Sequence, residues 1–255
     1  MSPSNSCDWR GAACRQLLLW SGISAAVVMG TTSVDCSGAE PQSAGASSKI
    51  TTSKAEPAAA EKFRPLFDGK SLKNWTVTDF GGQGEVEVKD GALILQQGSE
   101  ITGISWTGEP LPNINYEISL EAQRIDGSDF FCGIVFPVKE KFCSFVVGGW
   151  GGGVVGLSSI DNLYATENET ASFHTFKDKT WYKIRLRVAE KYIQAWIDDK
   201  MVIDLDMKGH EVSLHPAMLL AKPLGISCFS TVAAVRNIQF RGLKADELVH
   251  TPKAD

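Results

Sequence analysis

The sequence predicts an all-β fold, an antiparallel sandwich of two sheets or a jelly roll, preceded by a signal peptide and a disordered linker. Apolar and polar residues alternate over many short runs from Phe63 onward. Gly, Pro, Asn and Asp residues separate these runs, and none of the runs has the pattern of an amphipathic helix. The chain also contains 24 Gly and 7 Trp. This composition favours turn-rich sheets with aromatic surfaces over a helical bundle.

The first 35 residues resemble a targeting segment. The positively charged residues Arg10 and Arg15 precede the apolar run 16–29, and small residues follow it. These are the parts of a secretory signal, so we expect residues 1–35 to be a signal peptide. The chain has no charge between Arg15 and Asp35, which approaches the ~20 residues needed to cross a bilayer. An uncleaved membrane anchor, a lipoprotein signal acylated at Cys36 and a misplaced start codon are the alternatives.

Residues 36–62 contain no aromatic residue and balance three Lys against three Glu, which predicts a flexible linker. The folded domain is expected over residues 63–243, followed by a C-terminal tail over residues 244–255. The net charge is −5, from 25 basic and 30 acidic residues. Nucleic acid is an unlikely partner for such a chain. We expect an exported protein of the periplasm, the cell envelope or the medium, in contact with a membrane only if the anchor is retained.

Individual strands follow from the alternation and from the turns. Tyr116–Gln123 and Tyr182–Val188 alternate without a break, as half-buried antiparallel strands do. Asp90–Gly91 and Asp199–Lys200 are tight-turn sequences, and each predicts a hairpin. Further strands are expected at Gly103–Thr107, Phe130–Phe136, Phe142–Gly148, Val154–Ser158, Ala217–Lys222, Gly225–Phe229 and Ala234–Arg241.

The cysteines of the domain predict thiols rather than a disulfide or a metal site. A hairpin that turns at Val138–Lys141 places Cys132 opposite Val147 and Cys143 opposite Phe136. In that register the two cysteines are too far apart to bridge. The sequence has no CxxC and no His–Cys spacing. We therefore expect buried or semi-buried thiols, no metal ligands and no cofactor.

Seven motifs follow one another in the order of a known family: Phe63–Trp75, Val88–Leu95, Tyr116–Glu121, Asp126–Phe136, Trp181–Val188, Ile193–Val202 and Val235–Leu243. The domain thereby resembles the 3-keto-disaccharide hydrolase family, whose fold is a concanavalin-A-like jelly roll. The resemblance implies cleavage of 3-keto-glycosides by proton transfer. A C3 ketone acidifies the C2–H bond, a base removes that proton, the C1 substituent leaves, and water adds back. The stretch Phe142–Thr170 departs from the family strand, in which an aromatic–Glu pair leads into the ligand face.

A tryptophan among glycines is the first candidate for ligand binding. Trp150 lies within Gly148–Gly153. Glycines leave the indole uncovered, so it can stack on the C–H face of a sugar. Gly149 allows a ligand to approach the backbone closely. The alternative is a bulged strand whose Trp150 side chain fills the core.

The loop Ser159–Thr170 concentrates polar groups after a strand. Asp161 and Asn168 are expected to bind substrate, and Glu167 and Glu169 are candidates for proton transfer, since neighbouring carboxylates raise one another's pKa. The alternative is a solvated loop with an Asx turn.

Four further positions are candidates for chemistry. Asp129 is a candidate for proton transfer beside a ligand, or else a turn cap. Glu117 and Glu121 lie on one face of a strand, roughly 7 Å apart, as paired carboxylates or as an outward polar face. His174 is the histidine nearest in sequence to the polar loop, and is more often a surface residue than a base.

Two functions remain open at this point. The first is a hydrolase of 3-keto-glycosides or 3-keto-disaccharides, with Asp129, Glu167 and Glu169 transferring protons while Trp150 holds the sugar. The second is a non-catalytic, lectin-like carbohydrate-binding module of the cell envelope. A structural or partner-binding domain of the cell surface is a weaker third. The ligand expected for both leading functions is a carbohydrate.

Overall fold

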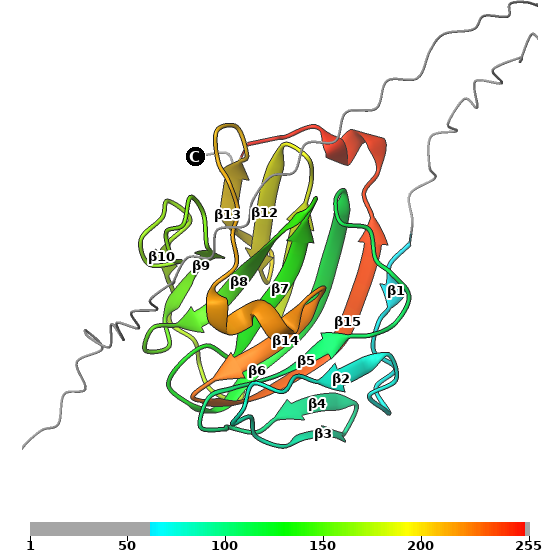
Figure 1. The fold of residues 1–255 in the computed structure, drawn as a ribbon, viewed down its shortest axis with the longest axis vertical. Helices are drawn as coiled ribbons and strands as arrows, with labels where there is room; N and C mark the ends of the chain where they lie inside the picture. The colour runs from blue at the N-terminus through cyan, green and yellow to red at the C-terminus, as the bar shows by residue number, and fades with distance from the viewer. Residues whose placement is uncertain (1–61, 253–255) are drawn as a thin grey trace, which may run out of the picture. The chain divides into compact units, whose positions relative to one another are not determined.

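The computed structural model describes residues 62–252, and these residues form two antiparallel sheets packed face to face (Figure 1). The predicted leader 1–35 and almost all of the predicted linker lie outside the described residues. Sheet A, with eight strands, has the order β13-β12-β11-β6-β15-β4-β3, and β1 pairs with β15. Sheet B, with seven strands, has the order β10-β9-β8-β7-β14-β5-β2. The predicted all-β sandwich is confirmed.

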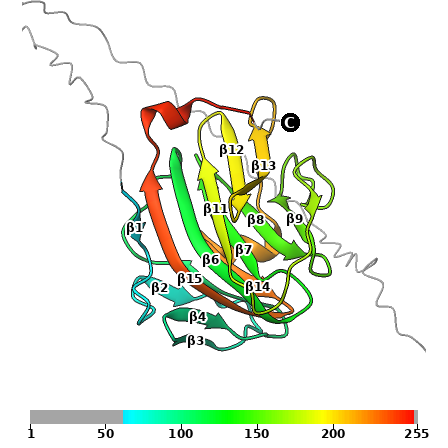
Figure 2. The same cartoon turned by 180° about the vertical axis from the view of Figure 1, so that it is seen from behind.

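Sheet A faces the viewer in Figure 2. It contains β1 (Arg64–Pro65), β3 (Val86–Lys89), β4 (Ala92–Leu95), β6 (Tyr116–Gly127), β11 (Tyr182–Val188), β12 (Tyr192–Ile197), β13 (Lys200–Asp206) and β15 (Thr231–Gly242). Sheet B contains β2 (Trp75–Val77), β5 (Ile101–Trp106), β7 (Cys132–Val138), β8 (Lys141–Gly149), β9 (Val154–Ser158), β10 (Ser172–Phe173) and β14 (Gly225–Phe229). Two short 3-10 helices complete the described part of the chain: η1 (Pro216–Ala221) and η2 (Ala245–Leu248).

The hairpins follow the turn sequences closely. Asp90 and Gly91 both have positive φ, 51° and 79°, as a type I′ turn requires between β3 and β4. The turn between β12 and β13 falls at residues 198–199, one residue earlier than predicted, because Ile197 pairs with Lys200. The positive φ of Asp198, 53°, suits an Asp better than a branched residue.

The core fills the space between the sheets with the inward half of each alternating strand. The cysteine register is as predicted, with Cys132 opposite Val147 and Cys143 opposite Phe136. These two cysteines and Cys228 are free and buried in the core. The prediction of buried thiols is confirmed.

One strand prediction is wrong. The segment Ala217–Lys222 lies almost entirely in the 3-10 helix η1 rather than in a strand. Pro216 begins the helix, and the ring of His215 accepts a hydrogen bond from the Ala217 N–H at 3.2 Å. Helical spacing brings Met218 and Ala221 to the same side, where they pack against sheet B.

The outer face of sheet A carries charged residues, and helix η2 covers part of this face. Glu117 is only 1% exposed, and its carboxylate contacts Arg187 at 2.8 Å and Arg241 at 2.9 Å. Glu247, on η2, contacts the same two guanidinium groups at 3.0 and 2.7 Å. The hydrogen bonds from Arg241 are the main reason why the pKa of Glu247 falls to about 2. Helix η2 thus covers Glu117, which is not part of the open polar face that we considered.

Candidate functional site

The outer face of sheet B is built from small side chains. Core residues on its strands alternate with outward positions. The small outward residues are Gly103, Ser105, Gly133, Ser144, Gly156, Gly225 and Ser227. Such a face leaves room above the sheet for other segments or for a ligand.

Two segments cover part of this face, namely the loop after β9 and the helix η1. A Cβ atom on Gly156 would lie 2.9 Å from the carbonyl oxygen of Ala165, so the loop after β9 rests directly on the strand. A Cβ atom on Gly225 would lie 2.5 Å from the carbonyl oxygen of Ala221, so η1 does the same over β14. Met218 and Ala221 bury the outward side chain of Val135. Both segments need the glycines beneath them.

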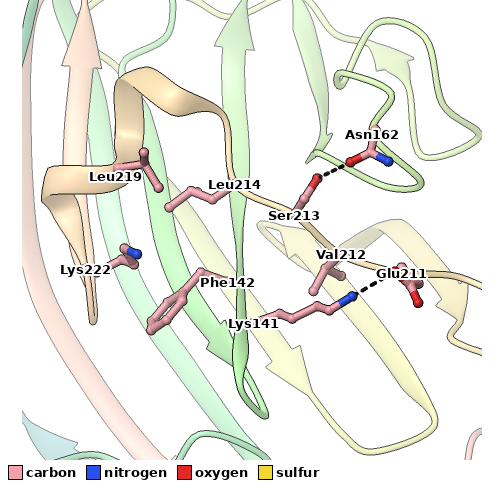
Figure 3. Close-up of a pocket in the computed structure, with 9 residues that line it drawn as sticks. All are labelled: Lys141, Phe142, Asn162, Glu211, Val212, Ser213, Leu214, Leu219 and Lys222. Carbon is pink, nitrogen blue, oxygen red and sulfur yellow. Dashed lines mark hydrogen bonds and ion pairs between the residues drawn. The ribbon is translucent and has the colours of Figure 1, made fainter. Parts of the chain in front are cut away.

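A cleft of about 290 Å³ remains between the two covering segments (Figure 3). It is lined by Lys141, Phe142, Asn162, Glu211, Val212, Ser213, Leu214, Leu219 and Lys222. Lys141 pairs with Glu211 at 2.7 Å, and the Ser213 hydroxyl donates to Asn162 at 3.2 Å. The Lys222 ammonium lies 5.1 Å from the Phe142 ring centroid. Charge in the cleft is therefore largely paired, and its size is at the lower limit for a small-molecule site.

Asp161 and Glu169 are brought together by a histidine that the sequence reading missed. His210 Nδ1 lies 2.7 Å from Asp161 Oδ2, and its Nε2 lies 3.0 Å from Glu169 Oε1. Both ring nitrogens face carboxylates, which fits the protonated imidazolium. The hydrogen bond to Asp161 is the main reason why the pKa of His210 is raised. The Glu211 N–H and then His210 lower the pKa of Asp161.

The histidine that we considered near this loop makes different contacts. His174 shares a 3.0 Å hydrogen bond with the Ser172 hydroxyl and lies beside Phe176. Burial lowers its pKa. The histidine beside the acidic loop is His210, from a segment 49 residues beyond Asp161. No local motif signals that pairing, because it depends on how the covering segments lie.

Glu167 and Asn168 hold the loop in shape. The Glu167 carboxylate accepts a hydrogen bond from the Tyr164 N–H at 3.0 Å. Asn168 is 9% exposed, and its amide donates to the carbonyl oxygens of Leu157 and Tyr164, each at 2.8 Å. Its Oδ1 accepts from the Thr170 hydroxyl at 2.6 Å. These contacts fix the loop that rests on Gly156.

Asp129, Gly149 and Trp150 form a separate group at the tip of the β8–β9 hairpin. Asp129 accepts hydrogen bonds from the Phe130 N–H at 2.8 Å and from the Gly151 N–H at 3.1 Å. A Cβ atom on Gly149 would lie 2.8 Å from a methyl group of Val146, so a larger residue would displace that side chain. Trp150 has a φ of 48° and is 47% exposed. The indole stays outside the core.

The two groups lie at opposite ends of β9. The hairpin tip precedes β9 and Asp161 follows it, and a five-residue strand is about 17 Å long. A second exposed aromatic residue accompanies Trp150 instead. Phe173, on β10, is 80% exposed and pairs with Val154, which in turn pairs with Gly149. Val154 alternates with the core residue Val155, so Phe173 stands on the outer face of sheet B.

Within residues 62–252, no cluster of His, Cys, Asp and Glu side chains is arranged to hold a metal ion. Neither of the two 3-10 helices in this region is a long enough apolar helix to cross a membrane. Ser144 stands on the outer face of sheet B, and its hydroxyl donates to the Ser158 carbonyl at 2.7 Å.

Comparison with known proteins agrees with the fold. A Bacillus subtilis protein of unknown function with a galectin-like fold is 11% identical, with a TM-score of 0.51 over 73% of this chain and 97% of that chain. The Crh5 transglycosylase in complex with NAG is 12% identical, with a TM-score of 0.50 over 73% of this chain and 85% of that chain. No curated protein matches the sequence.

The family model described as the 3-keto-alpha-glucoside-1,2-lyase-like domain matches residues 62–241. This range covers the motifs on which the resemblance was predicted, and nearly the whole of both sheets. The fold is a jelly roll of the glycosyl hydrolase-like and carbohydrate-binding kind. The chain belongs to the 3-keto-alpha-glucoside-1,2-lyase-like family.

Proposed function

We propose that this protein binds carbohydrate through a platform formed by Trp150 and Phe173. The observation that carries the proposal is the exposure of two aromatic rings, 47% and 80%, at one end of sheet B. Exposed aromatic faces stack on the C–H faces of sugars. Two strand spacings separate β8 from β10, so Gly149, which precedes Trp150, lies about 10 Å from Phe173 across the sheet. That separation suits two neighbouring sugar rings.

The platform is held in place by its own backbone. Asp129 binds the Gly151 N–H, and the Gly149 carbonyl accepts hydrogen bonds from Gly152 and Gly153 at 3.2 Å. A preorganised tip loses little conformational entropy when a ligand binds. In this proposal Asp129 and Gly149 position the platform, and the loop residues Glu167 and Asn168 support the face beside it.

Binding to an array of neutral oligosaccharides tests the platform. Trp150→Ala and Phe173→Ala should each lower the affinity at least tenfold, while Glu167→Gln and Glu169→Gln retain it. Leu220→Ala is the matched control, because Leu220 is a 62% exposed apolar residue on η1. An affinity that stays unchanged in both Trp150→Ala and Phe173→Ala, in folded protein, would overturn the platform.

A second candidate is cleavage of 3-keto-glycosides, and a different observation favours it. Glu169 and Asp161 flank His210, and their chain neighbours Asn162 and Glu211 line the cleft of about 290 Å³. Glu169, with a 59% exposed side chain, can reach a sugar and exchange a proton with the imidazolium. In this candidate Glu169 removes the C2 proton and His210 protonates the departing C1 oxygen. Asp129 and Glu167 are the alternative proton-transfer groups.

Incubation of the protein with a 3-keto-disaccharide tests cleavage. Sugar release that is lost in Glu169→Gln and retained in Glu190→Gln would support the candidate, since Glu190 is an exposed carboxylate that pairs only with Lys139. No release, with or without an added divalent metal, would reject it.

We also propose that the domain acts after export, in the periplasm, the cell envelope or the medium. The support is the composition of residues 1–35 and the linker-like character of residues 36–62. Sequencing the N-terminus of the protein recovered from its host tests cleavage of the leader. A mature chain that begins at Met1 would favour the retained anchor or an unexported protein.

A further inference from the structure

The outer face of sheet A holds a groove that is separate from the platform and from the cleft. Its volume is about 570 Å³, within the range of small-molecule sites. It crosses β3, β4, β15 and β6 at the end of the sheet drawn lowest in Figure 2. The floor is apolar and includes Ile94, Ile125, Val232 and Ala234. In the described part of the chain, the C-terminal helix η2 covers the other end of this face, over Glu117, and leaves the groove open.

One wall of the groove is a tryptophan held in a fixed orientation. The Arg236 guanidinium lies 4.0 Å from the Trp181 ring centroid. Arg236 is itself held by Glu121 at 2.7 Å, and Asn237 donates to the same carboxylate at 2.8 Å. The half-buried indole is therefore braced from one side. A fixed aromatic wall over an apolar floor suits a ligand with a flat apolar face.

Two side-chain amides at the groove have no protein partner. Gln96 and Gln123 line it, both half-buried, and neither amide forms a hydrogen bond within residues 62–252. Other polar side chains on this sheet face, such as Glu121 and Gln194, are hydrogen-bonded. A primary amide offers two donors and a carbonyl acceptor, which matches a sugar hydroxyl that both donates and accepts.

The charge of the groove selects against ionic ligands. Glu87 and Asp90 carry negative charge at its rim, and Lys89 and Arg236 carry positive charge. The charges cancel, whereas a phosphate or a nucleic acid would require an excess of basic groups. An added peptide strand would pair with a sheet edge rather than lie across the face of four strands.

We propose that this groove is a second carbohydrate site, which takes a neutral oligosaccharide across β4, β15 and β6. Trp181 stacks on one sugar ring, and Gln96 and Gln123 bind its hydroxyls. The site does not depend on the Trp150–Phe173 platform, since it lies on the other sheet. A chain with both sites would bind two glycan segments at once, and the effective concentration of the second contact would raise the avidity.

The test uses the double variant Trp150→Ala/Phe173→Ala on the array of neutral and sialylated oligosaccharides. We expect residual binding to neutral glycans, lowered about tenfold by Gln96→Ala together with Gln123→Ala, because two hydrogen bonds are lost. Trp181→Ala should abolish it. The glutamine variants keep the Trp181–Arg236 contact, so they should fold normally, and an unchanged thermal midpoint checks this. Gln97→Ala, an exposed neighbour outside the groove, is the matched control.

Each outcome decides for or against the groove. The groove is overturned if the double variant shows no residual binding. It is also overturned if the residual binding is unchanged by substitution of Gln96, Gln123 and Trp181, or if it prefers sialylated glycans. The platform is judged separately, in the protein with an intact groove. If Trp150→Ala leaves binding unchanged there while the glutamine substitutions abolish it, the groove stands and the platform fails.

Discussion

Replacing Glu117 with Gln tests whether the ion pairs of Glu117 beneath η2 stabilise the domain. The carboxylate is 1% exposed and touches Arg187, Arg241 and, at 3.5 Å, Arg185. Glutamine keeps the shape but removes the charge. Arg187 and Arg241 would then share the single carboxylate of Glu247, and Arg185 would lose its contact with Glu117.

The expected loss of unfolding free energy is about 3 kcal/mol. Breaking a buried ion pair by removing one partner costs about 3–5 kcal/mol, and the lower end applies because Glu247 keeps its bonds to Arg187 and Arg241. Glu121→Gln is the matched control on the same strand and face. Its side chain is 29% exposed and pairs with Arg236, which is 38% exposed, so about 0–1 kcal/mol is expected.

Urea unfolding followed by circular dichroism measures both variants. With a slope of roughly 2–3 kcal/mol per molar urea, Glu117→Gln should lower the midpoint by about 1 M. Its thermal midpoint should fall by about 6–12 °C. Equal midpoints for the two variants would show that burial of Glu117 under η2 contributes no stability, and the reasoning would fail.

Three further predictions follow from the described contacts. Gly225→Ala forces a methyl group against Ala221 and should destabilise the domain by about 1–3 kcal/mol in the same urea assay; an unchanged midpoint would mean that η1 does not rest on β14. The raised pKa of His210 means that its stabilising contact with Asp161 is complete below the ordinary value of 6.5 and is lost as pH rises through the folded value; the thermal midpoint should fall over that window in the parent but not in His210→Gln. Burial raises the pKa of the Cys143 and Cys228 thiols to about 12, so a thiol reagent followed by peptide mass spectrometry should label neither in the native protein, and labelling before unfolding would contradict their burial.

The parts of the fold that were predictable from sequence are those fixed by neighbouring residues. Asp90–Gly91 located a hairpin because its two residues accept positive φ. The β7–β8 register followed from a turn of known position. Segment Ala217–Lys222 was misread because its apolar residues fit a short strand as well as a helix, and only the room above Gly225 decides between them.

The candidate sites were less predictable because distant segments build them. The glycine neighbours allowed either an exposed or a core-filling Trp150, and the structure shows the exposed one. Phe173 enters the platform only through the pairing of β10 with β9. His210 lies 49 residues beyond Asp161, and Arg241 lies 124 residues beyond Glu117. Sequence spacing carries no information about such contacts. The groove beside Trp181 gathers the β3–β4 hairpin, β6 and β15, which lie far apart in the chain.

Both terminal segments of the domain contact one guanidinium. Arg241 lies 5.1 Å from the ring centroid of Phe63, and its Nη atoms contact Glu247 at 2.7 Å. From Glu247 the chain continues to Thr251, which contacts Gln194 on β12, three strand spacings or about 14 Å from β15. A linker that spans this distance from residue 252 to residue 62 could make the backbone circular, with a new opening cut at the exposed turn 198–199. For the same reason the whole sandwich could be inserted as a cassette into a surface loop of another protein. The host would attach beside Glu117, roughly 20 Å along β6 from Gln123, and would leave that half of the sheet unobstructed.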